Sequence, residues 1–243
     1  MHCALFIARL TIFFTGIIIS LAAAAGPSWI DSLESRYASA ARDYDSTSLM
    51  AAVESFNRQQ TPDRESGRAL LLLGLSYWRL ELIGYCEDDK TRVIHYGELA
   101  ISTLTRAEKA GADLYLTASH KALASQLLAA QGALKGMLYG PRSSSEAKKA
   151  RDANPTGYFS LLTEAVNASQ APKFAGGDEK KAIAALEKMT PEFPDSVDVK
   201  IHLARTYTKA GMTEEARNMI APIVAALPLN LLARKVAAEI PAK

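Results

Sequence analysis

The chain has 243 residues, of which 49% are hydrophobic and 22% are charged, with 28 basic and 26 acidic side chains. This hydrophobic content is enough for a packed core and excludes intrinsic disorder. A net charge of +2 lacks the excess of Lys and Arg that nucleic-acid binding needs, and two cysteines are too few for a disulfide framework or a cysteine zinc site. We therefore expect a folded protein of one or two domains that binds no nucleic acid.

Residues 1–25 are predicted to be a secretory signal peptide. They contain one charge, Arg9, followed by an uncharged apolar run that ends in small residues up to Ala25. Cleavage before Gly26 would leave a mature domain of residues 26–243, exported and, in a bacterium, periplasmic. The alternative is an uncleaved anchor, although the run is shorter than the roughly 20 residues that span a bilayer. We expect no later segment to cross a membrane, and hence a soluble mature protein.

The rest of the chain has apolar residues at intervals of three and four, the helical pattern, and lacks alternating strand patterns. Helices joined by short turns form antiparallel hairpins, so the sequence predicts an all-α fold of stacked helical hairpins. Gly140 and Pro141 are expected to stop the fifth helix. The predicted helices cover residues 32–42, 46–58, 61–85, 90–109, 113–137, 145–153, 156–168, 177–189, 196–210, 213–226 and 230–240.

A period of 34 residues recurs near the C-terminus. The residues that recur are Gly177, Ala182, Leu186 and Pro194, repeated as Gly211, Ala216, Ile220 and Pro228. Small residues allow two helices to cross closely, and glycine allows the left-handed turn between them. We predict two repeats at about 163–196 and 197–230, followed by a C-terminal capping helix at 230–240.

This pattern resembles the tetratricopeptide repeat (TPR), in which a small and an aromatic residue precede the turn glycine. Ala204 and Tyr207 precede Gly211 in this way, and Gly74 with Tyr77 gives the same first-helix pattern earlier in the chain. The resemblance implies a right-handed superhelix of stacked hairpins whose concave groove binds a peptide or a partner protein.

The Ala-Gly-Gly-Asp turn at 175–178 and the Tyr-Gly-Pro segment at 139–141 are also similar to a divergent group of bacterial exported TPR proteins. That group includes lipoproteins associated with tripartite solute transporters. This chain has no lipidation cysteine after its apolar run, so no functional residue is carried over. A second function therefore stays open: a solute-binding or transport accessory protein with a small-molecule cavity between helix 113–137 and its neighbours.

Eight side chains are predicted to line the groove, because they share the register of the first helix of each hairpin. Trp and Arg are enriched among the residues that dominate binding energy, so we expect Trp78 and Arg79 to be the main contact pair. The alternative is that Trp78 belongs to the core. The predicted groove residues are Leu71, Leu75, Trp78, Arg79, Ile201, Arg205, Thr208 and Lys209.

No motif predicts a catalytic residue, a cofactor or a metal. The histidines lack partners at metal-binding spacing. The carboxylates that follow Cys86 are expected to raise the pKa of its thiol, which opposes nucleophilic activation.

The basic run from Arg142 to Arg151 is interpreted as a solvated helix face or, alternatively, a contact for an anionic partner. We predict a non-catalytic scaffold, with a helical enzyme as a third alternative. The partner and the oligomeric state are not determined.

Overall fold

The computed structural model describes residues 28–241, which form eleven α-helices and two short 3₁₀ helices, with no strand in that range. The predicted signal peptide lies outside the described residues. The elements in chain order are α1 (Ser28–Arg42), α2 (Ser46–Arg58), η1 (Pro62–Glu65), α3 (Gly67–Cys86), α4 (Lys90–Lys109), α5 (Leu114–Ala129), α6 (Ala133–Ala153), α7 (Tyr158–Gln170), η2 (Lys173–Ala175), α8 (Glu179–Glu192), α9 (Val197–Lys209), α10 (Thr213–Ala226) and α11 (Leu231–Glu239).

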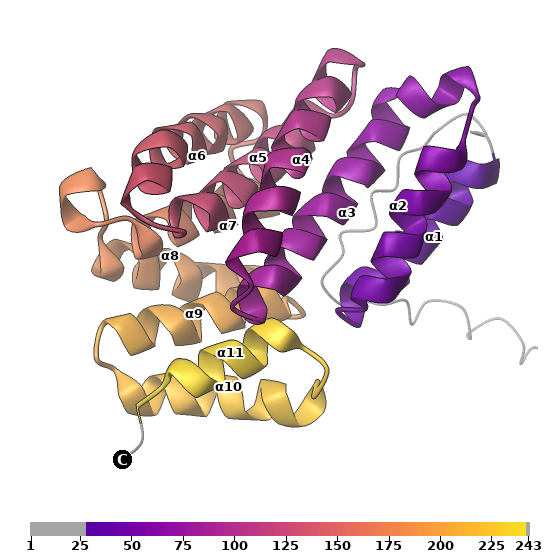
Figure 1. The fold of residues 1–243 in the computed structure, drawn as a ribbon. Coiled ribbons are helices and arrows are strands. Elements are labelled where there is room, and N and C mark those ends of the chain that lie inside the picture. The colour runs from indigo at the N-terminus through magenta and orange to yellow at the C-terminus, as the bar shows by residue number, and fades with distance from the viewer. Residues whose placement is uncertain (1–27, 242–243) are drawn as a thin grey trace, which may run out of the picture.

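The helices pack in sequential pairs from α1–α2 to α9–α10, and α11 closes the series (Figure 1). Each odd-numbered helix also contacts the next odd-numbered helix, so the first helices of the hairpins form one continuous layer. Each even-numbered helix contacts the first helix of the following hairpin. This arrangement confirms the predicted all-α fold of stacked hairpins and is consistent with TPR-like repeats.

The 34-residue period is visible in the helix caps and at the helix crossings. Ser196 and Asn230 occupy corresponding positions, and each side-chain oxygen accepts a hydrogen bond from a backbone N–H three residues later. Ala182 and Ala216 also correspond, and both are fully buried. The same local chemistry therefore begins and packs the helices of successive hairpins.

The turn glycines follow the prediction in one repeat and depart from it in the other. Gly211 has a φ of +78° between α9 and α10, as expected for a left-handed turn residue. In the preceding hairpin the left-handed glycine is Gly176, with a φ of +89°, rather than Gly177. The insertion that contains η2 brings the chain back on itself there, and a Cβ on Gly177 would lie 1.9 Å from the carbonyl oxygen of Ala171. Gly177 thus permits a close backbone approach.

The predicted helix 113–137 is wrong at its C-terminal end, because the hairpin turn falls at residues 130–132. Gly132 has a φ of +135°, a conformation that strongly favours glycine. Pro141, expected to stop a helix, instead lies inside α6, which also absorbs the predicted helix 145–153. Proline removes the hydrogen bond to the carbonyl of Met137, but both residues are exposed, so water can replace that bond.

Helix α3 forms the centre of the fold, and nearly all of its side chains are buried. It contacts α1, α2, α4, α5 and α11. Contrary to expectation, this segment is also long and apolar enough to span a membrane by length and composition, and it is the one such helix among residues 28–241. Because 83% of its most apolar window is buried within the fold, it has the surroundings of a core helix.

The C-terminal helices return to α3 and close the arc of hairpins (Figure 1). Lys235 of α11 forms an ion pair with Asp88, just after α3, at 2.6 Å. Arg205 of α9 donates a hydrogen bond to the hydroxyl of Tyr85 on α3 and pairs with Glu239 of α11 at 3.4 Å. These contacts hold α9 and α11 against the C-terminal end of α3.

Replacing Gly211 by valine tests the turn between α9 and α10. An added Cβ would meet no atom within 4 Å, so the cost comes from the positive φ alone. We expect Gly211→Val to lower the free energy of unfolding by about 1 kcal/mol in thermal or urea denaturation. The matched control is Gly136→Ala, inside α6, where the nearest atom lies 3.4 Å from an added Cβ. This substitution should stabilise the protein by about 0.5 kcal/mol. Equal effects of the two substitutions would contradict this turn geometry.

Candidate functional site

Five of the eight predicted groove residues lie in the core, so the expectation that they line an open groove is wrong for them. Trp78 and Arg79 are 8% and 2% exposed, and the other three residues, two on α3 and one on α9, are also buried. The physical reason is that α1, α5 and α11 pack around α3 and cover its surface. The buried groove candidates are Leu71, Leu75, Trp78, Arg79 and Ile201.

The other three candidates lie toward the C-terminal end of α9 and keep contact with solvent. Arg205 and Thr208 are half-buried, and Thr208 donates a hydrogen bond to the carbonyl of Ala204 at 3.0 Å. Lys209 is exposed, although its Nζ donates to the carbonyl oxygen of Ser169. Partial burial of this ammonium lowers the pKa of Lys209. A role for these three side chains in partner binding remains a prediction.

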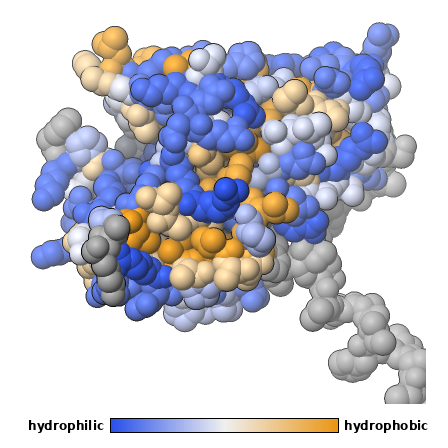
Figure 2. All heavy atoms as spheres, turned by 60° about the horizontal axis from the view of Figure 1, so that its bottom comes forward, coloured by the Kyte–Doolittle hydropathy of each residue, from blue (hydrophilic) through white to orange (hydrophobic). Residues whose placement is uncertain are grey.

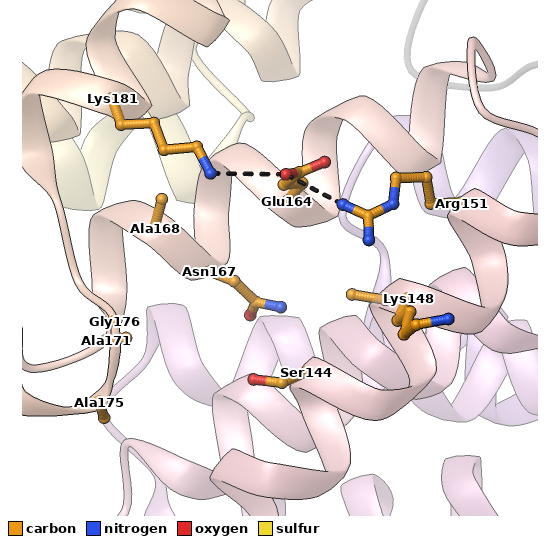
Figure 3. Close-up of a pocket in the computed structure, with 11 residues that line it drawn as sticks. Ser144, Lys148, Arg151, Glu164, Asn167, Ala168, Ala171, Ala175, Gly176 and Lys181 are labelled. Atoms are coloured by element: carbon orange, nitrogen blue, oxygen red, sulfur yellow. Dashed lines mark ion pairs between the residues drawn. The ribbon is translucent and has the colours of Figure 1, made fainter.

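The surface has a hollow of about 200 Å³ bounded by α6, α7 and the segment from η2 to α8 (Figure 3). Small side chains form much of its wall, and polar side chains surround its opening. We call it the α6–α7 hollow. Its lining residues are Ser144, Ala147, Lys148, Arg151, Glu164, Asn167, Ala168, Ala171, Ala175, Gly176 and Lys181.

The α6–α7 hollow carries more positive than negative charge. Three cations, Lys148, Arg151 and Lys181, line it together with one carboxylate, Glu164. Arg151 and Lys181 reach Glu164 from opposite sides, at 3.2 and 3.7 Å (Figure 3). These pairs are solvent-exposed, so each stabilises the fold by about 1 kcal/mol or less and can be exchanged for another anionic partner.

Asn167 supplies a fixed polar group to the same hollow. Its Oδ1 accepts hydrogen bonds from Gln126 Nε2 at 3.1 Å and from Ser143 Oγ at 2.9 Å. These two donors hold the amide oxygen toward the interior, and the amide nitrogen of Asn167 is directed into the hollow in Figure 3. The α6–α7 hollow therefore combines cations with a positioned hydrogen-bond donor, a set suited to a carboxylate.

A second hollow of about 200 Å³ adjoins the first along α7 and α8, and we call it the α7–α8 hollow. Glu164, Ala168 and Lys181 belong to both. Its other lining side chains are mainly apolar, among them Leu161 and Met189. The two hollows together form a surface that is cationic at one end and apolar at the other. Of this surface, only the basic run of α6 could be recognised in the sequence. The residues that α7 and α8 add to it come together only through tertiary packing.

Apolar side chains also gather on the face formed by the last helices, which is turned forward in Figure 2. Leu229 is largely exposed in the turn before α11. Half-buried apolar residues accompany it at the end of the helical series, namely Val224, Leu227, Leu231 and Ile240. This face is the exposed end layer of the stack.

The titratable groups of residues 28–241 include neither a metal-binding cluster nor an activated thiol. Among the described residues, no group of three or more His, Cys, Asp or Glu side chains is placed to hold a metal. Burial raises the pKa of the Cys86 thiol to about 12, while nearby Lys235 and Arg79 oppose the shift. The predicted direction of this shift is confirmed, but its main cause is burial rather than the neighbouring carboxylates. A thiol with this pKa is a poor nucleophile.

The C-terminal part of the chain matches a known family. The tetratricopeptide repeat model matches residues 173–240, the segment from η2 to the end of α11. Proteins use stacked repeats of this kind as scaffolds for binding other proteins. The curated proteins contain no significant match to this sequence. The TPR resemblance is therefore supported over residues 173–240.

Glu81 is an unusual group in the core of α3. Its side chain is fully buried, and neither carboxyl oxygen has a hydrogen-bond partner. It faces α4 so closely that a Cβ on Gly97 would lie 2.4 Å from Glu81 Oε1. Burial raises the pKa of Glu81 well above its usual value near 4.5, so the folded protein keeps this carboxyl protonated at a higher pH than the unfolded chain does.

This difference predicts how stability depends on pH. Above pH 4.5 the unfolded chain releases the Glu81 proton and the folded protein retains it, so Glu81 increasingly destabilises the fold as pH rises toward its folded pKa. We expect Glu81→Gln to be more stable than the natural protein at pH 7 and about equal to it below pH 4.5. Urea unfolding of both proteins across this range measures the difference. A constant difference at all pH values would contradict the assignment.

Proposed function

We propose that this protein is an exported, non-catalytic scaffold that binds a partner protein. The match of residues 173–240 to the tetratricopeptide repeat carries this proposal, because stacked repeats of this type present extended surfaces for protein binding. The regular pairing of α7–α8 and α9–α10 supports it. The proposed leader at residues 1–25 supports export to the bacterial periplasm.

The two hollows beside α7 are the proposed partner surface. The α6–α7 hollow has three cations against one carboxylate, and the α7–α8 hollow is mainly apolar. An extended segment with an acidic residue followed by an apolar side chain would complement both. Lys209, exposed at the end of α9, offers a further cation on the C-terminal repeats. The proposed contacts therefore lie in these two hollows rather than at Trp78.

Photo-crosslinking in cells tests this surface. A photoreactive amino acid at Lys148, in the α6–α7 hollow, should give a covalent adduct with one partner protein. The matched control places the same amino acid at Arg58, an exposed basic residue at the end of α2. We expect the Lys148 adduct to be lost when Arg151→Glu and Lys181→Glu are combined, because both cations would then repel an acidic segment.

The double substitution should leave folding intact, since these exposed ion pairs contribute about 1 kcal/mol or less each. An unchanged melting temperature verifies this. The proposed surface is wrong if the same adduct forms from Arg58, or if charge reversal in a folded protein leaves the Lys148 adduct unchanged.

A further inference from the structure

Arg79 is a buried cation without a local counter-ion. Its side chain is 2% exposed, and within the described part of the chain no carboxylate lies within 4.0 Å of it. Its Nε has no hydrogen-bond partner. The guanidinium carbon lies 4.9 Å from the centre of the Trp78 ring and 5.3 Å from that of Tyr44. The faces of these rings attract a cation, but they offer the guanidinium N–H groups no conventional hydrogen-bond acceptor.

Two further donors beside Arg79 are buried and unpaired. Trp78 Nε1 and the Tyr44 hydroxyl have no hydrogen-bond partner, and both belong to the side chains that contact the guanidinium. Buried donors are normally paired in folded proteins, and an unpaired group calls for a specific physical reason. Three such donors on three contacting side chains form what we call the Arg79 cluster.

The Arg79 cluster lies where the first helices of the hairpins converge. The Tyr37 hydroxyl on α1 accepts a hydrogen bond from the Arg79 guanidinium. Tyr158 on α7 and Asp198 on α9 interact with the charge of Arg79. Each of these three residues keeps part of its surface exposed, but its hydroxyl or carboxyl group is buried. Burial raises the pKa of Asp198, and the positive charge of Arg79 opposes that shift.

His120 of α5 completes one side of the cluster as a neutral group. Its ring lies 4.8 Å from that of Trp78. Its Nδ1 donates a hydrogen bond to the carbonyl of Leu116 at 2.8 Å, and burial lowers the pKa of His120 to about 4. His120 therefore carries no charge near neutral pH, and the positive charge here belongs to Arg79.

We infer that the Arg79 cluster is a binding site for the carboxylate of a small organic acid. The guanidinium can donate two parallel hydrogen bonds to a carboxylate, and the Tyr44 hydroxyl and Trp78 Nε1 can donate further ones. The rings of Trp78, Tyr44 and His120 provide apolar surface for the rest of the ligand. This site lies inside the helical layer, is distinct from the two hollows, and adds a small-molecule function to the proposed scaffold.

Water or an internal carboxylate could also accept hydrogen bonds from the donors of the Arg79 cluster. Each of these partners predicts a different experimental result. If ordered water satisfies the three donors, no acid binds selectively. If Asp198 serves as a counter-ion to Arg79 at longer range, its removal weakens the site. If an external carboxylate occupies the site, Asp198 repels it, and Asp198→Asn should strengthen binding.

The experiment uses the full chain with benzoate as the probe and benzamide as its uncharged counterpart. We expect benzoate to raise the melting temperature and benzamide to leave it unchanged. Arg79→Met should abolish the shift, or weaken benzoate binding at least tenfold by calorimetry. Asp198→Asn should tighten benzoate binding. The matched control is Arg234→Met, which removes an exposed basic residue of α11 and should leave benzoate binding unchanged.

A second measurement covers the case in which Arg79→Met does not fold. In the natural protein, the NMR resonance of Arg79 Nε–H should move on addition of benzoate and stay fixed with benzamide. Tyr44→Phe should weaken benzoate binding severalfold while the protein remains folded. The inference is overturned if benzoate gives neither a thermal nor an NMR shift, if benzamide acts equally, or if folded Arg79→Met binds benzoate as the natural protein does.

Discussion

The enclosure of α3 is the constraint on which the rest of the structure depends. This helix contacts α1 and α2 on the N-terminal side and α11 at the other end of the chain, in addition to α4 and α5. Burial of its Leu-rich surface supplies much of the hydrophobic stabilisation of the larger core cluster. A helical repeat that remained open would expose that surface. Closure of the arc therefore follows from the composition of α3.

The same enclosure places charged groups where water cannot fully solvate them. Arg79 and Glu81 both lie on α3, two residues apart, and neither forms an ion pair within the described residues. Their energetic consequences differ, because a carboxyl group can become neutral and a guanidinium cannot. A cation that must remain charged needs an anion or a polar partner, so function is more naturally assigned to Arg79 than to Glu81.

Local features of the fold were predictable from the sequence, and long-range ones were not. Ser196, Asn230 and Gly211 act through neighbours within a few residues, so their pattern predicted the C-terminal hairpins. The burial of Trp78 depends on helices distant in the sequence. Likewise, the α6–α7 hollow joins Lys148 with Lys181 across α7, which no local pattern reveals. The turn at Gly132 was missed because Gly140-Pro141 is the stronger local stop signal.

Native-state hydrogen exchange of α3 tests the central claim most directly. If α3 is enclosed by α1, α5 and α11, the amides of residues 71–84 should be among the slowest to exchange and should open only with global unfolding. Amides in the exposed outer helix α2 should exchange faster. Exchange in α3 as fast as in α2, under conditions where the protein remains folded, would show an open inner surface and contradict the account.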